Sequence, residues 1–310
     1  MVSKASQPQQ VSHNHHYVSA GYLAQFTDKG TKKGLLCVLD FSEKKFDRKK
    51  PKEVASEVDY NLVESPNLTP DAYETAQGRF EGEAIRRIRE ICKSGMMLDE
   101  HSFSYIHNLI MLFIIKNPAL RNARTRMQDT IYRQAMKLNT ANQRIYEQSV
   151  DRAKKNGFIS PHLNTPYEKA KDFVERGEFT IHIPSHSHVV TEMSAFNELL
   201  PFVAERYWSV MNVAIGAPDL ITCDRPAPPQ VNVDPIIFTI SPRRALMGIT
   251  SFRPPNEFEI DIGQVARINT DLLEQANNQI YSRNENITLL KENKIGIFDM
   301  RQIFPAQAGT

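Results

Sequence analysis

The sequence predicts an α+β fold, with a predominantly helical body, an N-terminal β-hairpin and a small C-terminal antiparallel sheet. Three observations predict it. The segment 34–41 is dense in apolar and β-branched residues, as in a buried strand. Apolar residues between positions 69 and 115 recur at helical spacing. After position 208, short apolar runs alternate with breaks that contain Pro, Gly or Ser.

The N-terminal stretch 13–26 combines histidines with aromatic residues. Residues 1–12, which are rich in Ser and Gln, predict a disordered lead-in. Further on, Tyr22, Leu23 and Phe26 share one helix face. Because these apolar side chains follow two adjacent histidines, we expect the imidazoles to be held against the body of the protein.

The hairpin is predicted from the strand at 34–41 and a return strand at 44–48. Six of the residues between Lys44 and Lys52 are Lys or Arg. Lysine on an edge strand prevents pairing with other chains, so a solvent-exposed edge explains these charges. A phosphate contact is the alternative.

The helical body begins with a helix over residues 69–92, whose apolar residues fall on one stripe. A second helix begins at Asp99 and has a wide apolar face, as a buried helix would. Asn117-Pro118 ends it, because proline lacks a backbone donor and disfavours the helical conformation of the residue before it.

A long polar helix is predicted from 119 to 155, where proline and glycine are absent. Residues 116–156 contain ten Lys or Arg and three Asp or Glu, a surplus of seven positive charges. One interpretation is an anionic partner such as nucleic acid. The steering side chains would be Arg121, Arg124, Arg126 and Arg133. The alternative is a solvated outer helix, because aromatic residues that could stack on bases are few.

A short helix, a strand at 178–183 and a helix ending near residue 207 complete the helical body. His182, His186 and His188 lie within seven residues of one another. No Asp, Glu or Cys stands among them, so a polar turn is favoured over a metal site.

The C-terminal part has short apolar runs in place of the helical spacing seen before it. Four short apolar runs predict an antiparallel meander: 208–215, 220–223, 236–240 and 245–250. An amphipathic helix follows over 264–282, and 287–298 adds an edge strand. The tail 301–310 is predicted to be loose.

We expect one α+β domain over residues 13–300. Its parts are the N-terminal helix and hairpin (13–60), the helical body (69–207) and the sheet with its closing helix (208–300).

The predicted location is the cytoplasm. Three widely spaced cysteines without a CxxC pair favour a reducing compartment. No secretory signal is visible at the start of the sequence. The longest apolar run, 109–115, is far shorter than the ~20 residues of a membrane span, so no membrane partner is expected.

Several common catalytic motifs are absent. The sequence has no P-loop, no dinucleotide-binding fingerprint, no H-E-x-x-H zinc motif and no G-x-S-x-G nucleophile elbow. Cys223 precedes Asp224, but its apolar strand favours a buried thiol over a nucleophile.

Several motifs together carry a family resemblance. The opening stretch follows a His-His-Tyr-x-Pro-x-x-Tyr-Leu-x-x-Phe pattern, with Ser19 at the proline position. Glu81 matches an acidic position on a mid-chain helix of the pattern, Trp208 precedes a Thr-Cys-Asp-x-Pro turn, and Asn278 stands near the end of the last predicted helix. In these features the chain resembles the domain-of-unknown-function 4238 family of bacterial and phage-associated proteins, over about residues 13–285. The resemblance implies no activity, and Ser19 is expected to loosen the start of the opening helix.

If these segments meet, His16, Glu81, Asp224 and Asn278 form one candidate catalytic cluster. The imidazole and the two carboxylates, His16, Glu81 and Asp224, could hold a divalent metal ion or activate water. This interpretation predicts a metal-assisted phosphodiesterase. Such an enzyme could be a nuclease effector, and the resemblance adds only the expectation that it acts in phage–host conflict.

The sequence leaves two other classes of function open. The chain could be a non-enzymatic binding or sensor protein with a partner protein, or a plain nucleic-acid binder. In either case the cluster would be structural, for example with Asp224 accepting backbone N–H groups in a turn.

Overall fold

The computed structural model describes residues 13–63, 69, 72–228 and 230–303. The chain forms two compact units, which are described separately below. The core unit comprises residues 1–117 and 185–310, and the helical unit comprises residues 118–184. The predicted lead-in and most of the predicted loose tail lie outside the described residues.

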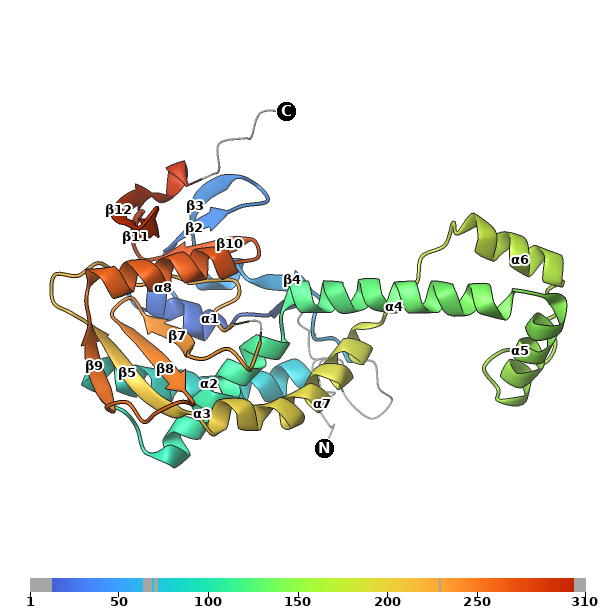
Figure 1. Cartoon of the computed structure of the whole chain (residues 1–310), viewed down its shortest axis with the longest axis horizontal. Coiled ribbons are helices and arrows are strands. Elements are labelled where there is room, and N and C mark those ends of the chain that lie inside the picture. Colours follow the sequence, from blue (N-terminus) through green and yellow to red (C-terminus); the bar gives the residue numbers. More distant parts are fainter. Residues whose placement is uncertain (1–12, 64–68, 70–71, 229, 304–310) are drawn as a thin grey trace, which may run out of the picture. The chain divides into compact units, whose positions relative to one another are not determined.

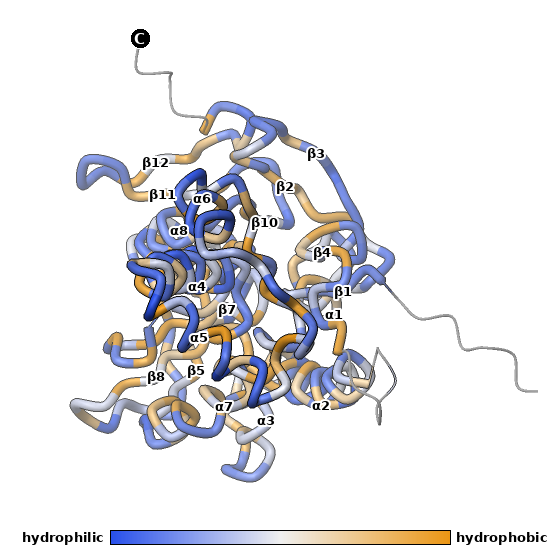
Figure 2. Tube along the Cα trace, turned by 90° about the vertical axis from the view of Figure 1, so that its right-hand side faces the viewer, coloured by the Kyte–Doolittle hydropathy of each residue, from blue (hydrophilic) through white to orange (hydrophobic). Residues whose placement is uncertain are grey.

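The first sheet of the core unit has the strand order β3-β2-β10-β6. Its strands are β2 (Leu36–Asp40), β3 (Lys45–Lys49), β6 (Thr222–Cys223) and β10 (Gln279–Ser282) (Figure 1). The predicted hairpin is confirmed, because β2 is buried throughout and pairs antiparallel with β3. The lysine-bearing β3 is an edge strand and is mostly hydrophilic (Figure 2). Because β10 pairs with β2 and β6, this sheet joins the hairpin to the turn that contains Asp224.

The second sheet of the core unit has the strand order β7-β8-β5-β9. Its strands are β5 (Tyr207–Val213), β7 (Ile236–Ser241), β8 (Arg244–Ile249) and β9 (Glu257–Ile260). All pairs are antiparallel except β5 with β9, which are parallel. The predicted meander is therefore divided, because the run 220–223 supplies β6 to the other sheet. The sequence did not reveal β9, in which only Ile260 is buried.

The last predicted helix ends early. Helix α8 spans Ile262–Gln275, and the chain then extends through Ala276 into β10. The N–H groups of residues 277–279 are bound by the Asp224 carboxylate, so they are not available to continue the helix. The predicted edge strand is a hairpin of β11 (Asn286–Lys291) and β12 (Lys294–Asp299). Both turn residues between these strands have positive φ, as in tight hairpin turns.

Among the described residues, the core unit has four α-helices besides α8. They are α1 (Ala20–Leu23, continued by a 3-10 turn), α2 (Ala72–Ser94), α3 (Glu100–Ile115) and α7 (Ser185–Ala204). Helix α3 packs against α2 and α7, and most of its residues are buried. The apolar stripe predicted on α2 is buried at Ala84, Ile85, Ile88 and Ile91. The α+β prediction is confirmed.

The opening stretch forms part of this core. Strand β1 (Asn14–His16) pairs with β4 (Ser56–Val58) and leads directly to α1. Tyr22 is fully buried, and its ring centroid lies 5.2 Å from that of Phe113 and 5.3 Å from that of Phe238. The prediction that aromatic anchors hold this stretch against the body is confirmed.

The helical unit contains α4 (Pro118–Asn139), α5 (Gln143–Lys155) and α6 (Tyr167–Arg176). The single polar helix predicted here is two helices, because Asn142 accepts the N–H of Ile145 and starts a new one. The strand predicted at 178–183 is extended chain without a strand partner among the described residues. Arg133 instead donates to the carbonyl oxygens of Gly177 and Phe179. None of the described helices is both long and apolar enough to cross a bilayer.

Candidate functional site

A buried lysine at the end of α3 organises a polar network in the core unit. Lys116 is 1% exposed, and its Nζ donates to the backbone oxygen of His16 (2.6 Å) and to Oε1 of Gln77 (2.9 Å). Gln77 in turn donates from Nε2 to Oε1 of Glu81 at 2.7 Å. Gln77 and Glu81 are four residues apart on α2, so their side chains lie one above the other. One chain of hydrogen bonds thus joins β1 to Glu81.

His16 contributes an imidazole whose Nε2 is buried and has no hydrogen-bond partner in the described part of the chain. Burial lowers the pKa of His16, Glu74 opposes this shift, and the charge of Lys116 adds to it. The ring is therefore neutral at pH 7 and can accept a proton or bind a metal ion. A buried polar atom without a partner is rare and calls for an explanation.

The same surroundings shift the pKa of Glu81 in the opposite direction. Burial raises the pKa of Glu81, while the charge of Lys116 and hydrogen bonds from Gln77 and Ser19 lower it. Its carboxyl group therefore retains a proton to higher pH than an exposed glutamate. The charge of Lys116 thus acts on both groups, the His16 imidazole with its lowered pKa and the Glu81 carboxyl with its raised pKa.

Ser19 stands where the family pattern has proline, and the expectation that it loosens the opening helix is wrong. Its hydroxyl accepts the N–H of Gly21 at 3.2 Å, which makes it the N-cap of α1.

The second histidine of the pair has a different environment. His15 is fully buried, and its Nδ1 accepts the backbone N–H of Asn61 at 2.9 Å. The Asn61 side chain donates to the Glu74 carboxylate. These contacts fasten β1 to the segment that follows β4.

Asp224 accepts three backbone N–H groups. Its carboxylate binds the N–H groups of Asn277 (2.9 Å), Asn278 (2.8 Å) and Gln279 (3.1 Å), and the residue is 4% exposed. Burial raises the pKa of Asp224 to about 6, although these donors pull it down. The sequence left open a structural role in which Asp224 binds backbone N–H groups of its own turn, but the donors found here lie 53 to 55 residues further along the chain.

Asn278 also has a structural contact, because its Oδ1 accepts the N–H of Ser42 at 2.9 Å. Ser42 lies in the turn between β2 and β3, so Asn278 ties the hairpin turn to the start of β10. Its side chain acts there as a hydrogen-bond acceptor for the fold.

The opening stretch is within electrostatic range of Asp224. Burial raises the pKa of Tyr17 well above its usual value, and the negative charge of Asp224 is the next cause. Tyr17 directly follows His16, the last residue of β1, so the charge of Asp224 acts on the residue next to His16.

The metal prediction has no three-ligand group to support it. In the described residues, no cluster of three or more His, Cys, Asp or Glu is arranged to hold a metal ion. His16 and Glu81 belong to the Lys116 network, whereas the Asp224 oxygens are already occupied by N–H groups. Binding of a divalent metal by His16, Glu81 and Asp224 therefore stays a prediction.

A comparison with protein-family models identifies the chain. Residues 14–286 match the model described as "protein of unknown function (DUF4238)". The chain belongs to this family. Neither a curated protein nor a solved structure matches the chain. The DUF4238 match includes His16, Glu81 and Lys116 as well as Asp224.

Lys116 is the residue of this DUF4238 site that sequence reasoning missed. In the sequence it is one of ten positive charges of residues 116–156, and Lys116-Asn117-Pro118 partly matches an Arg-Thr-Pro turn of the family pattern; neither observation indicates a buried side chain. The available signal was its position: it directly follows the apolar residues of α3, where a charged side chain enters the interior.

The predicted steering arginines lie on α4 of the helical unit. Arg121 is buried, and Arg133 pairs with Asp129 (2.8 Å) besides binding two backbone carbonyls. Arg124 is only partly exposed, whereas Arg126 is exposed. Of the four, Arg126 is best placed to meet a phosphate, and nucleic-acid steering stays a prediction.

Proposed function

We propose that this DUF4238 protein is a hydrolase of phosphodiester bonds in which His16 and Glu81 act as base and acid. The observation that supports the proposal is the network through Lys116 and Gln77. It joins the backbone oxygen of His16, whose imidazole Nε2 has no partner in the described part of the chain, to Glu81, whose pKa is raised by burial. Pairs of titratable groups whose surroundings move their pKa values apart are characteristic of acid–base sites.

In the proposed reaction, neutral His16 takes a proton from water as the water oxygen attacks phosphorus. The bond from phosphorus to the leaving oxygen breaks, and protonated Glu81 supplies the proton that this oxygen needs. His16 then releases its proton and Glu81 regains one from solvent, which restores the starting state. Lys116 positions both groups, since it binds the backbone of one and the hydrogen-bond partner of the other.

The substrate class and the metal are parts of the same proposal. Phosphodiester substrates are supported by the positive surplus of residues 116–156. In a metal-assisted form of the proposal, His16 Nε2 and the deprotonated Glu81 carboxylate would hold a divalent cation instead of transferring protons, and the cation would polarise the phosphate and lower the pKa of the attacking water. The biological form we propose is a nuclease effector in phage–host conflict.

A non-enzymatic binding protein is the second candidate. The three N–H groups on Asp224 favour it, because they give this carboxylate a complete structural role. In that case Lys116 also serves only to fasten β1 to the helices.

The test is hydrolysis of duplex DNA, single-stranded DNA, RNA and bis-p-nitrophenyl phosphate, with EDTA or with added Mg²⁺, Mn²⁺ or Zn²⁺. We expect His16→Asn and Glu81→Gln each to lower the rate by about 100-fold or more, with unchanged melting temperatures. The matched controls are His162→Asn and Glu198→Gln, which alter exposed residues of the same types and should retain full activity. Absence of hydrolysis under all conditions, or equal rates in all variants, would support the second candidate instead.

A further inference from the structure

Helix α4 carries a row of large aliphatic side chains in solvent. Met127, Ile131 and Leu138 are 58%, 54% and 69% exposed. Their spacing of four and seven residues places them on one face of the helix, as in the seam of a coiled coil. We call these three residues the α4 stripe. Exposed aliphatic residues in a row, rather than scattered singly, mark an interaction site.

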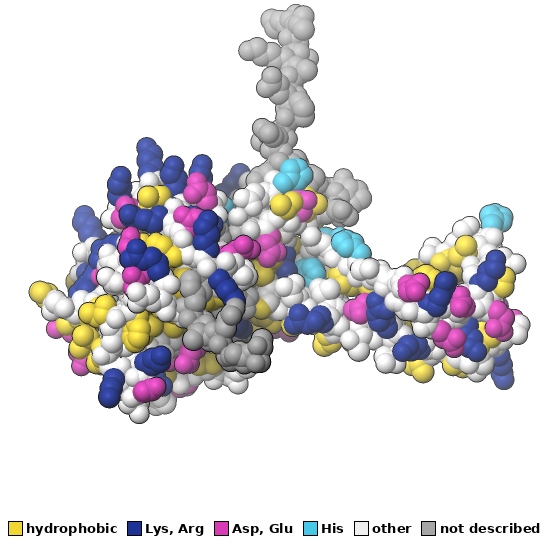
Figure 3. Space-filling view, turned by 90° about the horizontal axis from the view of Figure 1, so that it is seen from above, with side chains coloured by type: hydrophobic (Ala, Val, Ile, Leu, Met, Phe, Trp, Pro, Cys, Tyr) yellow, Lys and Arg dark blue, Asp and Glu magenta, His cyan; other side chains and the backbone are white. Residues whose placement is uncertain are grey.

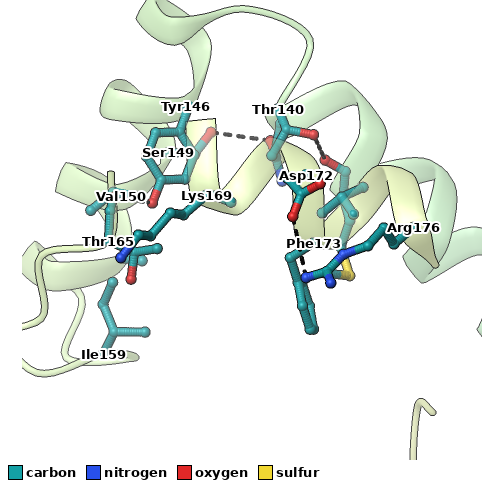
Figure 4. A pocket seen from close by; sticks show the side chains of 15 residues that line it. Thr140, Tyr146, Ser149, Val150, Ile159, Thr165, Lys169, Asp172, Phe173 and Arg176 are labelled. Carbon is teal, nitrogen blue, oxygen red and sulfur yellow. Dashed lines mark hydrogen bonds and ion pairs between the residues drawn. The ribbon is translucent and has the colours of Figure 1, made fainter. Parts of the chain in front are cut away.

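The packing of the helical unit does not use the α4 stripe. Met136 and Thr140 lie on the other side of α4 and line a pocket of about 730 Å³ with residues of α5 and α6. Thr140, Tyr146 and Phe173 surround this pocket in Figure 4. Arg133, one turn before Met136, holds the segment after α6. The side of α4 that carries Met136 and Thr140 already faces α5 and α6. The α4 stripe is therefore a second apolar face, and it has no partner in the described chain.

The charges beside the stripe are positive. Arg126 and Lys137 directly precede Met127 and Leu138, and neither forms an ion pair in the described part of the chain. Helix α4 as a whole has five Lys or Arg and one acidic residue, Asp129, which is paired with Arg133. In the space-filling view, the helical unit as a whole carries both Lys or Arg and Asp or Glu side chains among its hydrophobic ones (Figure 3).

We propose that the α4 stripe docks an acidic amphipathic helix of a partner protein. The aliphatic row would fit the apolar face of that helix, and Arg126 and Lys137 would pair with acidic side chains on its flanks. A second copy of this chain would bring like charges together along α4, which disfavours self-association. Nucleic acid would meet aliphatic rather than stacking aromatic side chains along the stripe.

The test is binding of a fluorescent 21-residue helical peptide with leucine on its apolar face and glutamate on both flanks. A peptide with lysine in place of glutamate is its matched control, and full-length protein is titrated into each. We expect micromolar affinity for the acidic peptide and at least about tenfold weaker affinity for the basic one. Affinity for the acidic peptide should fall as salt is raised.

Three variants test whether the acidic peptide binds at the α4 stripe. Ile131→Asp should weaken acidic-peptide binding at least about tenfold, and Arg126→Glu with Lys137→Glu should reverse the peptide preference. Phe158→Asp alters a side chain that is 79% exposed outside α4, so it controls for loss of surface hydrophobicity and should change nothing. Circular dichroism confirms folding of each variant.

Three results would overturn the proposal. The first is equal binding of the acidic peptide to wild type and Ile131→Asp, or none up to millimolar concentration. The second is a wild-type dimer that Ile131→Asp dissociates, which would make a second copy the occupant. The third is a DNA duplex that binds wild type but not Ile131→Asp and displaces the peptide. None of these results depends on whether His16 and Glu81 hydrolyse a substrate.

Discussion

The hydroxyl oxygen of Tyr22 lies 2.7 Å from that of Thr222, which is 200 residues further along the chain. The Tyr22 hydroxyl donates to the backbone oxygen of Thr239, also at 2.7 Å, which leaves Thr222 to donate to Tyr22. This contact holds α1 against β6, the strand that ends directly before Asp224. It is the structural reason why the stretch that starts with His16 and the turn at Asp224 belong to one part of the molecule.

Tyr22→Phe should destabilise the protein by about 1–3 kcal/mol, because the backbone oxygen of Thr239 and the hydroxyl of Thr222 lose a buried partner. The measurement is the free energy of unfolding in urea. Tyr207→Phe, at a half-exposed tyrosine, is the matched control and should have an effect below about 0.5 kcal/mol. Equal effects of the two changes would contradict the assigned role of Tyr22.

Lys116→Met keeps the length of the side chain but removes its charge and its hydrogen bonds. We expect a loss of about 3 kcal/mol, because buried oxygens of His16 and Gln77 lose a charged donor. Lys137→Met, at an exposed lysine on α4, should be nearly neutral in the same urea experiment. A stable Lys116→Met variant would show that the network does not hold β1.

Asp224→Ala leaves three backbone N–H groups without an acceptor, at residues 277–279. We expect it to lower the free energy of unfolding by about 3 kcal/mol. Amide hydrogen exchange should also become faster at these three positions. Asp271→Ala, which removes an exposed carboxylate from α8, controls for the loss of an acidic charge. If Asp224→Ala abolished hydrolysis without loss of stability, Asp224 would be catalytic rather than structural.

His107 should make the protein sensitive to acid. Burial lowers the pKa of His107 from 6.5 to about 4, and its ring packs against Phe103 and Trp208. Between these pH values the unfolded chain binds more protons than the folded one, so stability is full above pH 6.5 and falls toward pH 4. The stability lost across this pH range is about 3 kcal/mol.

His107→Leu fills similar space without a titrating group, so its stability should fall less between pH 7 and pH 4.5. The difference is measured as urea unfolding at the two pH values. If the free energy of unfolding fell equally with pH in wild type and in His107→Leu, the role of this histidine would be refuted.

The fold was predictable where local pattern and burial agree. The stripe on α2, the run of β2 and the aromatic residues of α1 are buried as their spacing indicated. Errors arose where a side chain from elsewhere binds the backbone, a cause that local spacing cannot reveal. Asp224 ends α8 early by binding residues 277–279. Arg133 likewise replaces the strand partner expected for residues 178–183.

The candidate site was predictable in part. The sequence indicated His16, Glu81 and Asp224 by residue type and family pattern, but not which of them share hydrogen bonds. The connection between His16 and Glu81 depends on Lys116 and Gln77, whose side chains meet only because α2 and α3 pack together. From the sequence alone, a buried lysine at the end of an apolar helix cannot be distinguished from an exposed one, because lysine is mostly exposed in proteins.

The central claim is that His16 and Glu81 belong to one site organised by Lys116. The most direct measurement is an NMR titration of the His16 imidazole and the Glu81 carboxyl, in wild type and in Lys116→Met. The positive charge of Lys116 lowers both pKa values, so its removal should raise both in a variant that keeps the wild-type fold. A folded Lys116→Met protein in which only one of the two pKa values rises would show that the groups do not share a site.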